Sequence, residues 1–210
     1  MLEVHRVLDF LEWLVANKKW NYLAAGVALQ GLAGLQLQEA LRLRWGNVDF
    51  DNCTITIEGE VKNRYRIRRI PVCSVVLWLL KWHRRSFEVR TPNNNRVLRH
   101  YQRYEGYSDA VRKALALWDP KVVLKPKDLR NTLQTAAIDG GWYDYYLKRY
   151  VGHAPTTIGE KHYFGDQGRR LTPLFQEKVV KNIEVEISTW EAPEPSLILP
   201  GPRLVKRQEA

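Results

Sequence analysis

The sequence predicts a mainly α-helical domain that carries one small antiparallel β-sheet, an α+β arrangement. Most segments repeat apolar residues at helical spacing, whereas only two neighbouring segments have the character of paired strands. Glycines stand where several of the helical patterns stop, as expected at helix ends. The chain has 210 residues, enough for one domain with a substantial hydrophobic core.

Three helical segments are expected in the first quarter of the chain. Residues 2–15 repeat apolar side chains at helical spacing and predict an amphipathic helix. Residues 23–32 are apolar on nearly all sides, which predicts a buried helix. After a break at Gly31 and Gly34, residues 36–45 resume the helical period.

The sheet is expected in the next segment. Residues 53–57 alternate as a strand, and residues 66–72 are β-branched and basic, so the two are expected to pair as a hairpin with Lys62 near its turn. The only two cysteines, Cys53 and Cys73, are predicted to be ordinary thiols in a reducing compartment rather than a disulfide.

The second half is predicted to be helical, followed by a tail. The expected helices are 75–85, 108–117, 127–139, 143–150 and 172–187. Gly140 and Gly141 end the third of them. Residues 191–210 are rich in proline and predict a flexible C-terminal tail after a domain of residues 1–190.

The charge balance favours a polyanionic partner. Lysine and arginine number 33 against 23 acidic residues, a formal net charge of +10. No apolar run reaches the roughly 18 residues of a membrane span, so nucleic acid is preferred to a membrane as the partner. Candidate DNA contacts lie mainly in the basic stretches 62–69 and 81–90, with solvated helix faces as the alternative. These candidates are Arg64, Arg66, Arg68, Arg69, Arg84, Arg85 and His162.

Several routes to phosphate chemistry are disfavoured by the sequence. Acidic residues are not clustered as a two-metal site would require, and no glycine-rich phosphate loop occurs. The five histidines lack zinc-ligand spacing. We therefore expect no metal site and no cofactor. A nucleic-acid enzyme of this kind needs a covalent nucleophile and cationic side chains that hold the phosphate.

Five short blocks occur in the order found in one enzyme family. They are residues 34–49, Lys62 with residues 68–72, Lys127-Asp128-Leu129-Arg130, Gly152-His153 and Lys161-His162-Tyr163. Arg130 and His153 are 153 − 130 = 23 residues apart, and Tyr163 follows 163 − 153 = 10 residues later. Over residues 2–190 this series resembles the catalytic domain of the tyrosine recombinases, the phage-type integrase family.

The resemblance implies a fold and a setting. It implies the tyrosine-recombinase catalytic-domain fold of DNA breaking-rejoining enzymes, here expected without the family's N-terminal core-binding domain. It also implies site-specific DNA recombination or integration by a mobile genetic element. The expected location is the cytoplasm, on the nucleoid, in a prokaryotic or phage system.

The resemblance also implies roles for five residues. Tyr163 would attack the scissile phosphate, leaving a 3′-phosphotyrosyl bond and a free 5′-hydroxyl. Arg130 and His153 would bind the non-bridging oxygens. Lys62 would protonate the leaving oxygen, and Lys127 would assist proton transfer from the tyrosine. Because the phosphotyrosyl bond stores the energy of the broken one, no nucleotide cofactor is needed.

One position departs from the family pattern. Gln36 stands where the family has its first catalytic arginine, with Glu39 expected to support the site by holding an arginine or a backbone amide. Glutamine lacks the charge and fork of arginine, and Arg42 and Arg44 lie too far along the helix to replace it. Three explanations stay open: a degenerate paralogue, an inactivating substitution, or compensation by another arginine.

The leading interpretation is therefore a site-specific DNA recombinase or integrase, impaired by Gln36. The first alternative is a catalytically degenerate DNA-binding or synapsis module, and the second is a topoisomerase-like nicking enzyme. The helix at 172–187 and the apolar residues 197–199 predict a homo-oligomer on DNA in which the C-terminal segment docks on a neighbour. The alternative is a helix that covers its own domain.

Overall fold

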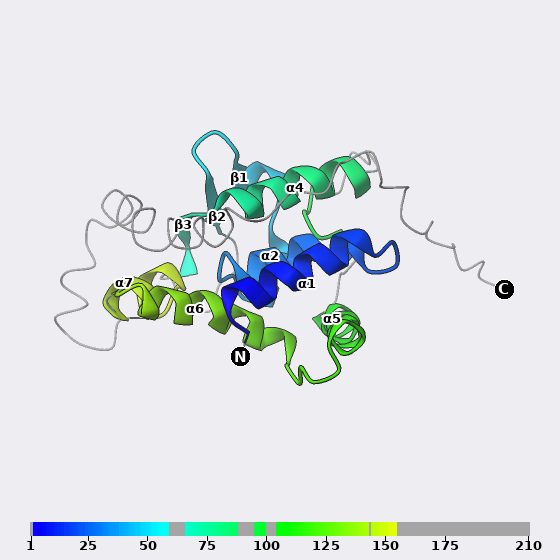
Figure 1. Cartoon of the computed structure of the whole chain (residues 1–210). Helices are drawn as coiled ribbons and strands as arrows, with labels where there is room; N and C mark the ends of the chain where they lie inside the picture. Colours follow the sequence, from blue (N-terminus) through cyan, green and yellow to red (C-terminus); the bar gives the residue numbers. More distant parts are fainter. Residues whose placement is uncertain (1, 59–65, 88–94, 100–103, 143, 155–210) are drawn as a thin grey trace.

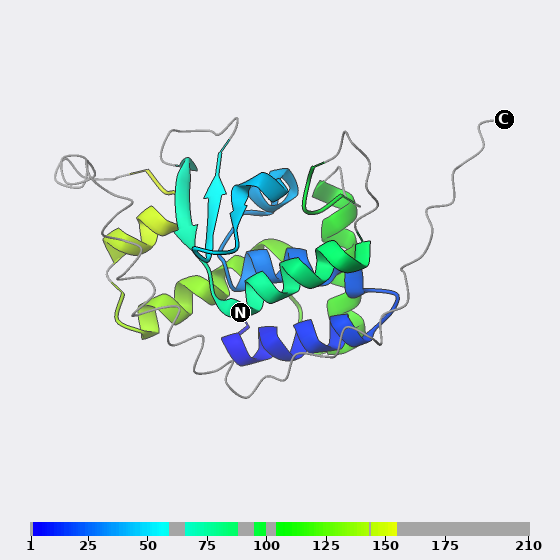
Figure 2. The same ribbon diagram turned by 90° about the horizontal axis from the view of Figure 1, so that it is seen from above.

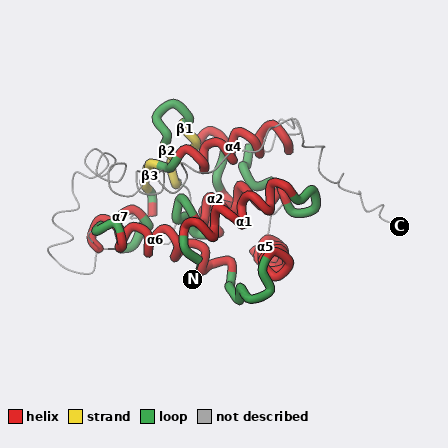
Figure 3. Tube along the Cα trace, viewed as in Figure 1, coloured by secondary structure: helices red, strands yellow, loops and turns green. Residues whose placement is uncertain are grey.

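The computed structural model describes residues 2–58, 66–87, 95–99, 104–142 and 144–154. Within these residues the chain is mainly helical and has a single sheet of three short strands, which confirms the predicted fold class (Figures 1 and 3). The helices are α1 (Val4–Ala16), α2 (Ala24–Gly31), α3 (Leu37–Arg42), α4 (Ser74–Phe87), α5 (Tyr104–Trp118), α6 (Arg130–Asp139) and α7 (Asp144–Tyr150).

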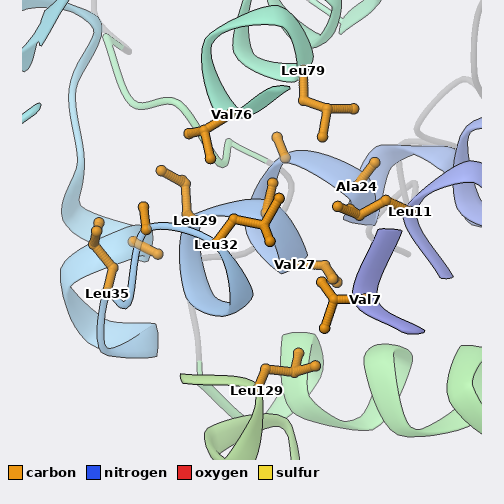
Figure 4. Packing of buried hydrophobic residues seen from close by; sticks show 14 of the residues in the cluster. Val7, Leu11, Ala24, Val27, Leu29, Leu32, Leu35, Val76, Leu79 and Leu129 are labelled. Carbon is orange, nitrogen blue, oxygen red and sulfur yellow. The ribbon is translucent and has the colours of Figure 1, made fainter. Parts of the chain in front are cut away.

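Helix α2 forms the centre of the core. All eight of its residues are buried, as its uniformly apolar sequence predicts, and it contacts α1, α3, α4 and α6. Figure 4 shows Leu29 and Leu32 packed among apolar side chains that reach them from neighbouring segments. Burial of such side chains stabilises the fold, since each fully buried leucine contributes about 1.5–3 kcal/mol.

The sheet has the order β1 (Val48–Asp49), β2 (Thr54–Ile57) and β3 (Arg68–Pro71), and all neighbours are antiparallel. The pairing of β2 with β3 was predicted, whereas β1 was not, because two residues give no alternation to detect. Seen from above, β3 lies on the side of the sheet that faces α7 (Figure 2). This neighbourhood brings the basic strand next to the end of α7.

Three helix boundaries differ from the prediction. The predicted helix 36–45 ends at Arg42, because Leu43 is extended and the next turn, Trp45–Asn47, is a 3₁₀ helix. The helix predicted to begin at Lys127 starts with the 3₁₀ turn Pro126–Leu129, since proline favours the first position of a helix. Helix α5 begins at Tyr104, earlier than residue 108.

Several predictions lie outside the described residues. They concern Lys62, Arg64, His162 and Tyr163, the helix at 172–187 and the tail at 191–210.

Candidate active site

Arg130 is the residue around which the site is built. It opens α6 and only 7% of its surface is exposed. Its Nη2 donates a hydrogen bond to the carbonyl oxygen of Val151, the residue before Gly152 and His153. The structure thus brings the Lys127–Arg130 block and the Gly-His block, 23 residues apart in the sequence (153 − 130), into direct contact.

Gly152 and His153 close the C-terminal end of α7. The amide of Gly152 donates to Arg149 O over 3.1 Å and that of His153 donates to Lys148 O over 2.8 Å, the hydrogen bonds of a Schellman cap. Gly152 has φ +76°, and a Cβ there would lie 2.6 Å from Nη1 of Arg68. Only glycine therefore fits this turn without displacing a neighbour.

Arg68 and Glu39 form a buried ion pair behind this turn. Arg68 Nη1 donates to Glu39 Oε1 over 2.9 Å, and their side chains are only 7% and 5% exposed. Arg68 Nε also donates to Tyr150 O over 2.5 Å. Glu39 Oε2 accepts the backbone amide of Gln36 over 2.9 Å, which caps α3. One carboxylate therefore holds both an arginine and a backbone amide.

The position of Arg68 does not suit the DNA contact predicted for it. In β3, Arg68 lies on the same face as Ile70, which is 2% exposed, and this face turns inward. Arg69 alternates to the exposed face, where it donates to Asp49 over 2.6 Å and to Thr54 over 2.8 Å. Because successive side chains of a strand point to opposite faces, the sequence already indicates that only one of these two arginines faces outward.

Gln36 contacts a second arginine that the sequence did not connect with it. Arg66 Nη1 donates a hydrogen bond to Gln36 Oε1. Arg66 is half-buried, and its Nε has no hydrogen-bond partner among the described residues, as is also true of Arg130 Nε. Each of these two guanidinium groups thus has a buried Nε–H without a partner in the described part of the chain.

A cavity of about 470 Å³ opens between these residues. Gln36, Arg66, Arg130 and Lys127 all line it, and Lys127 is exposed on the 3₁₀ turn before α6. Glu58 also lines the cavity, where its carboxylate accepts a hydrogen bond from Asn47 over 2.5 Å. The remaining lining residues come mainly from the loop before α3, α3 itself and β2.

The electrostatics of the site favour an anion. Burial lowers the pKa of Arg130 to about 10, the charge of Glu39 opposes this shift, and the charges of Arg68 and Arg66 add to it. Arg130 is therefore still protonated at neutral pH. Partial burial of the imidazole lowers the pKa of His153 below 6.5, and the charges of Arg130 and Arg66 lower it further. His153 is exposed and does not line the cavity, so an anion would relieve both shifts only if it lay between the cavity and the imidazole.

The other predicted DNA contacts in the described part lie on α4. Arg84 and Arg85 are exposed near its C-terminal end, and the guanidinium of Arg84 lies 5.3 Å from the ring centre of Trp45. Among the described residues, no helix is long and apolar enough to cross a membrane. In that same part of the chain, no three His, Cys, Asp or Glu side chains come together as a metal site.

Solved structures with the same fold are site-specific recombinases and integrases. An integrase of transposon Tn1549 in complex with transposon DNA matches 81% of this chain at 15% identity and a TM-score of 0.55. The XerA recombinase matches 84% at 12% identity and a TM-score of 0.60. The integrase of mycobacterium phage Brujita matches 85% at 20% identity and a TM-score of 0.56. This chain covers 62%, 63% and 55% of those chains, respectively.

A search of curated proteins gives no significant match. The sequence model of the phage integrase family, in contrast, matches residues 2–168, which include all five blocks found in the sequence. The chain belongs to the phage integrase family, the DNA-recombining tyrosine recombinases.

Proposed function

We propose that this chain cuts and rejoins DNA through a 3′-phosphotyrosyl intermediate, as a site-specific recombinase or integrase. The observation that supports the proposal is the hydrogen bond from Arg130 to Val151 O, which joins Arg130 to the turn of Gly152 and His153, beside a cavity that Arg130 and Lys127 line. These blocks come from separate parts of the sequence, and a solvated helix face would not bring them together.

The chemistry follows from the side chains. The hydroxyl oxygen of Tyr163 attacks the phosphorus, the bond from phosphorus to the 5′-oxygen breaks, and Lys62 gives a proton to that oxygen. The tyrosine proton leaves with the assistance of Lys127. Arg130 and His153 bind the non-bridging oxygens as charge builds on them, which is the main source of rate enhancement in such transfers. A 5′-hydroxyl attacking the phosphotyrosine reverses the step and rejoins the strand.

Double-stranded DNA is the proposed partner. The net charge of +10 supports it, as do the exposed Arg84 and Arg85. The matching Tn1549 integrase is described in complex with transposon DNA. We also propose that the chain assembles as a homo-oligomer on DNA, with its C-terminal segment docking on a neighbouring copy.

A second candidate function follows from Gln36. A glutamine has no charge to set against the phosphate, and removing one transition-state donor lowers the rate by about 10²–10³. The chain would then be a DNA-binding or synapsis module derived from an integrase. The two functions differ in whether a covalent protein–DNA bond forms.

The test is to trap that bond. The full chain is incubated with nicked duplexes that carry a randomised segment, and complexes that survive SDS are recovered and sequenced. We expect an adduct whose peptide is linked through Tyr163, its loss in Tyr163→Phe, and its retention in Tyr146→Phe, a tyrosine on α7 outside the cavity. An adduct on another residue would contradict the assignment. Absence of any adduct, both in the parent and in Gln36→Arg, would contradict the function.

A further inference from the structure

The space beside Gln36 already contains a guanidinium. Arg66 Nη1 donates to Gln36 Oε1, and both side chains line the same cavity as Arg130. Arg66 comes from the segment just before β3, 30 residues after Gln36 (66 − 36). The charge missing from the start of α3 is thus supplied from the sheet side of the cavity.

Arg66 is the arginine with donors to spare. The neighbouring Arg68 uses four of its five N–H donors: that of Nε on Tyr150 O, those of Nη1 on Glu39 and on Arg66 O, and one of Nη2 on Glu39. Arg66 is half-buried, and within the described part of the chain its Nε is buried without a partner. A buried donor without a partner is costly, and a small movement of the side chain toward an oxyanion in the cavity would satisfy it.

The backbone of Arg66 is held in place. Arg68 Nη1 donates to Arg66 O over 2.8 Å. A Cβ on Gly152 would lie 3.2 Å from Arg66 Cα, so the turn that carries His153 packs directly against this residue. Arg66 therefore lies between the start of α3 and the Gly-His turn, the two places where a bound phosphate is expected to be held.

The charge of Arg66 acts on the other two phosphate-binding groups. It contributes to the lowered pKa of Arg130 and of His153. The charged side chains that line the cavity are four cations, Arg42, Arg66, Lys127 and Arg130, and two carboxylates, Glu39 and Glu58, so the lining carries a net charge of 4 − 2 = +2. A phosphodiester oxygen pair is the natural partner for that excess.

Glutamine at position 36 is suited to this arrangement. Its amide oxygen accepts the hydrogen bond from Arg66, whereas an arginine has no acceptor and would repel a second guanidinium at that distance. Gln36 and Arg66 thus form a pair in which the amide oxygen of Gln36 fixes the direction of the Arg66 guanidinium.

We propose that Arg66 is a catalytic residue that binds the scissile phosphate together with Arg130 and replaces the arginine missing at position 36. This inference rests on the proposed function. It makes the chain an active recombinase with a relocated arginine rather than a degenerate one.

The test uses single-turnover adduct formation on a nicked duplex recovered from the randomised pool, at saturating DNA, so that the rate is separated from affinity. Arg66→Gln is expected to slow the adduct by about 10²–10³. The double variant Gln36→Arg/Arg66→Gln, which moves the arginine to the other side of the pair, is expected to regain most of that loss. Arg112→Gln removes an exposed charge on α5 and is expected to react as the parent does.

The outcomes separate the two proposals. Recovery in the double variant identifies a role in chemistry that a merely structural residue would not show, and thermal melting of each variant checks that the fold is kept. If the parent forms the adduct and Arg66→Gln forms it equally fast, this inference is wrong and the proposed function stands. If only Gln36→Arg is active, Arg66 does not compensate. If neither the parent nor Gln36→Arg forms the adduct, both proposals fail.

Discussion

Arg68 and Glu39 meet in a two-point ion pair inside the protein, with nitrogen–oxygen distances of 2.9 and 3.1 Å. The pair ties β3 to the start of α3, and the same arginine reaches the last carbonyl of α7 at Tyr150. The elements that carry Arg66, Gln36 and His153 are therefore held by one network, so a change in the pair is transmitted to the site.

Glu39→Gln is expected to lower the free energy of unfolding by about 3–5 kcal/mol, because it leaves the buried Arg68 without its counter-charge. Urea denaturation followed by circular dichroism measures it. The matched control is Asp109→Asn, which breaks the exposed pair with Arg112 and is expected to change stability by less than about 1 kcal/mol. Equal effects for the two variants would show that the Glu39 pair is not buried as described.

Gly152→Ala is expected to destabilise the protein more than Gly141→Ala. Both glycines have positive φ, +76° and +74°, so both alanines carry the backbone strain of about 1–2 kcal/mol. Only at Gly152 does the added Cβ also meet a side chain, 2.6 Å from Arg68 Nη1, whereas nothing lies within 4 Å of a Cβ at Gly141. Thermal unfolding of the two variants gives the comparison, and equal losses would contradict the steric contact with Arg68.

The pKa of His153 is expected below 6.5 in the free protein and to rise when sulfate is added, because a bound anion offsets the charges of Arg130 and Arg66. An NMR titration of the imidazole measures both values. Arg130→Gln should raise the pKa without sulfate, while Arg112→Gln should leave it unchanged. If the pKa of His153 changes neither when sulfate is added nor in Arg130→Gln, His153 lies outside the anion site.

The same shift predicts how stability depends on pH. The folded state holds His153 neutral more strongly than the unfolded chain does, so in the window just below pH 6.5 the unfolded state binds more protons. The contribution of His153 to stability is therefore complete above pH 6.5 and is lost as the pH falls through 6.5 toward the folded pKa. Replacing His153 by glutamine should flatten this part of the stability curve.

Binding to double-stranded DNA is expected to weaken steeply as salt rises, because each neutralised phosphate adds about 0.9 to the slope of log K against log salt. Arg66→Gln should reduce that slope by about one, since it removes one phosphate contact. Fluorescence anisotropy at several salt concentrations measures the slope. Binding that does not respond to salt would contradict the electrostatic account of the basic surface.

Much of the fold could be predicted because its local signals agree with one another. The apolar helix α2, the pairing of β2 with β3, and the end of α6 at its glycines all follow from short-range patterns. Strand β1 and the early start of α5 at Tyr104 could not be predicted, because tertiary packing rather than local periodicity decides them.

The site was predictable only in part. The order of the blocks predicted that Arg130 and His153 act at one site, and the structure shows a hydrogen bond from Arg130 to Val151 O, two residues before His153. The contact between Gln36 and Arg66 could not be predicted, since it depends on the direction of two side chains from distant segments. The burial of Arg68 was not predicted, because its basic neighbours suggested an exposed surface. Arg68 is two residues from the apolar Ile70, however, and this spacing indicates that both side chains share the inward face of the strand.

The hydrogen bond from Arg66 to Gln36 also constrains how this site can change by mutation. An arginine restored at position 36 while Arg66 is still present places two like charges side by side, and a loss of Arg66 first leaves the cavity one cation short. If Arg66 has the proposed role, the two positions are expected to be epistatic, because each single substitution alone gives a less active protein. A lineage with this pairing would then keep it until both positions change together.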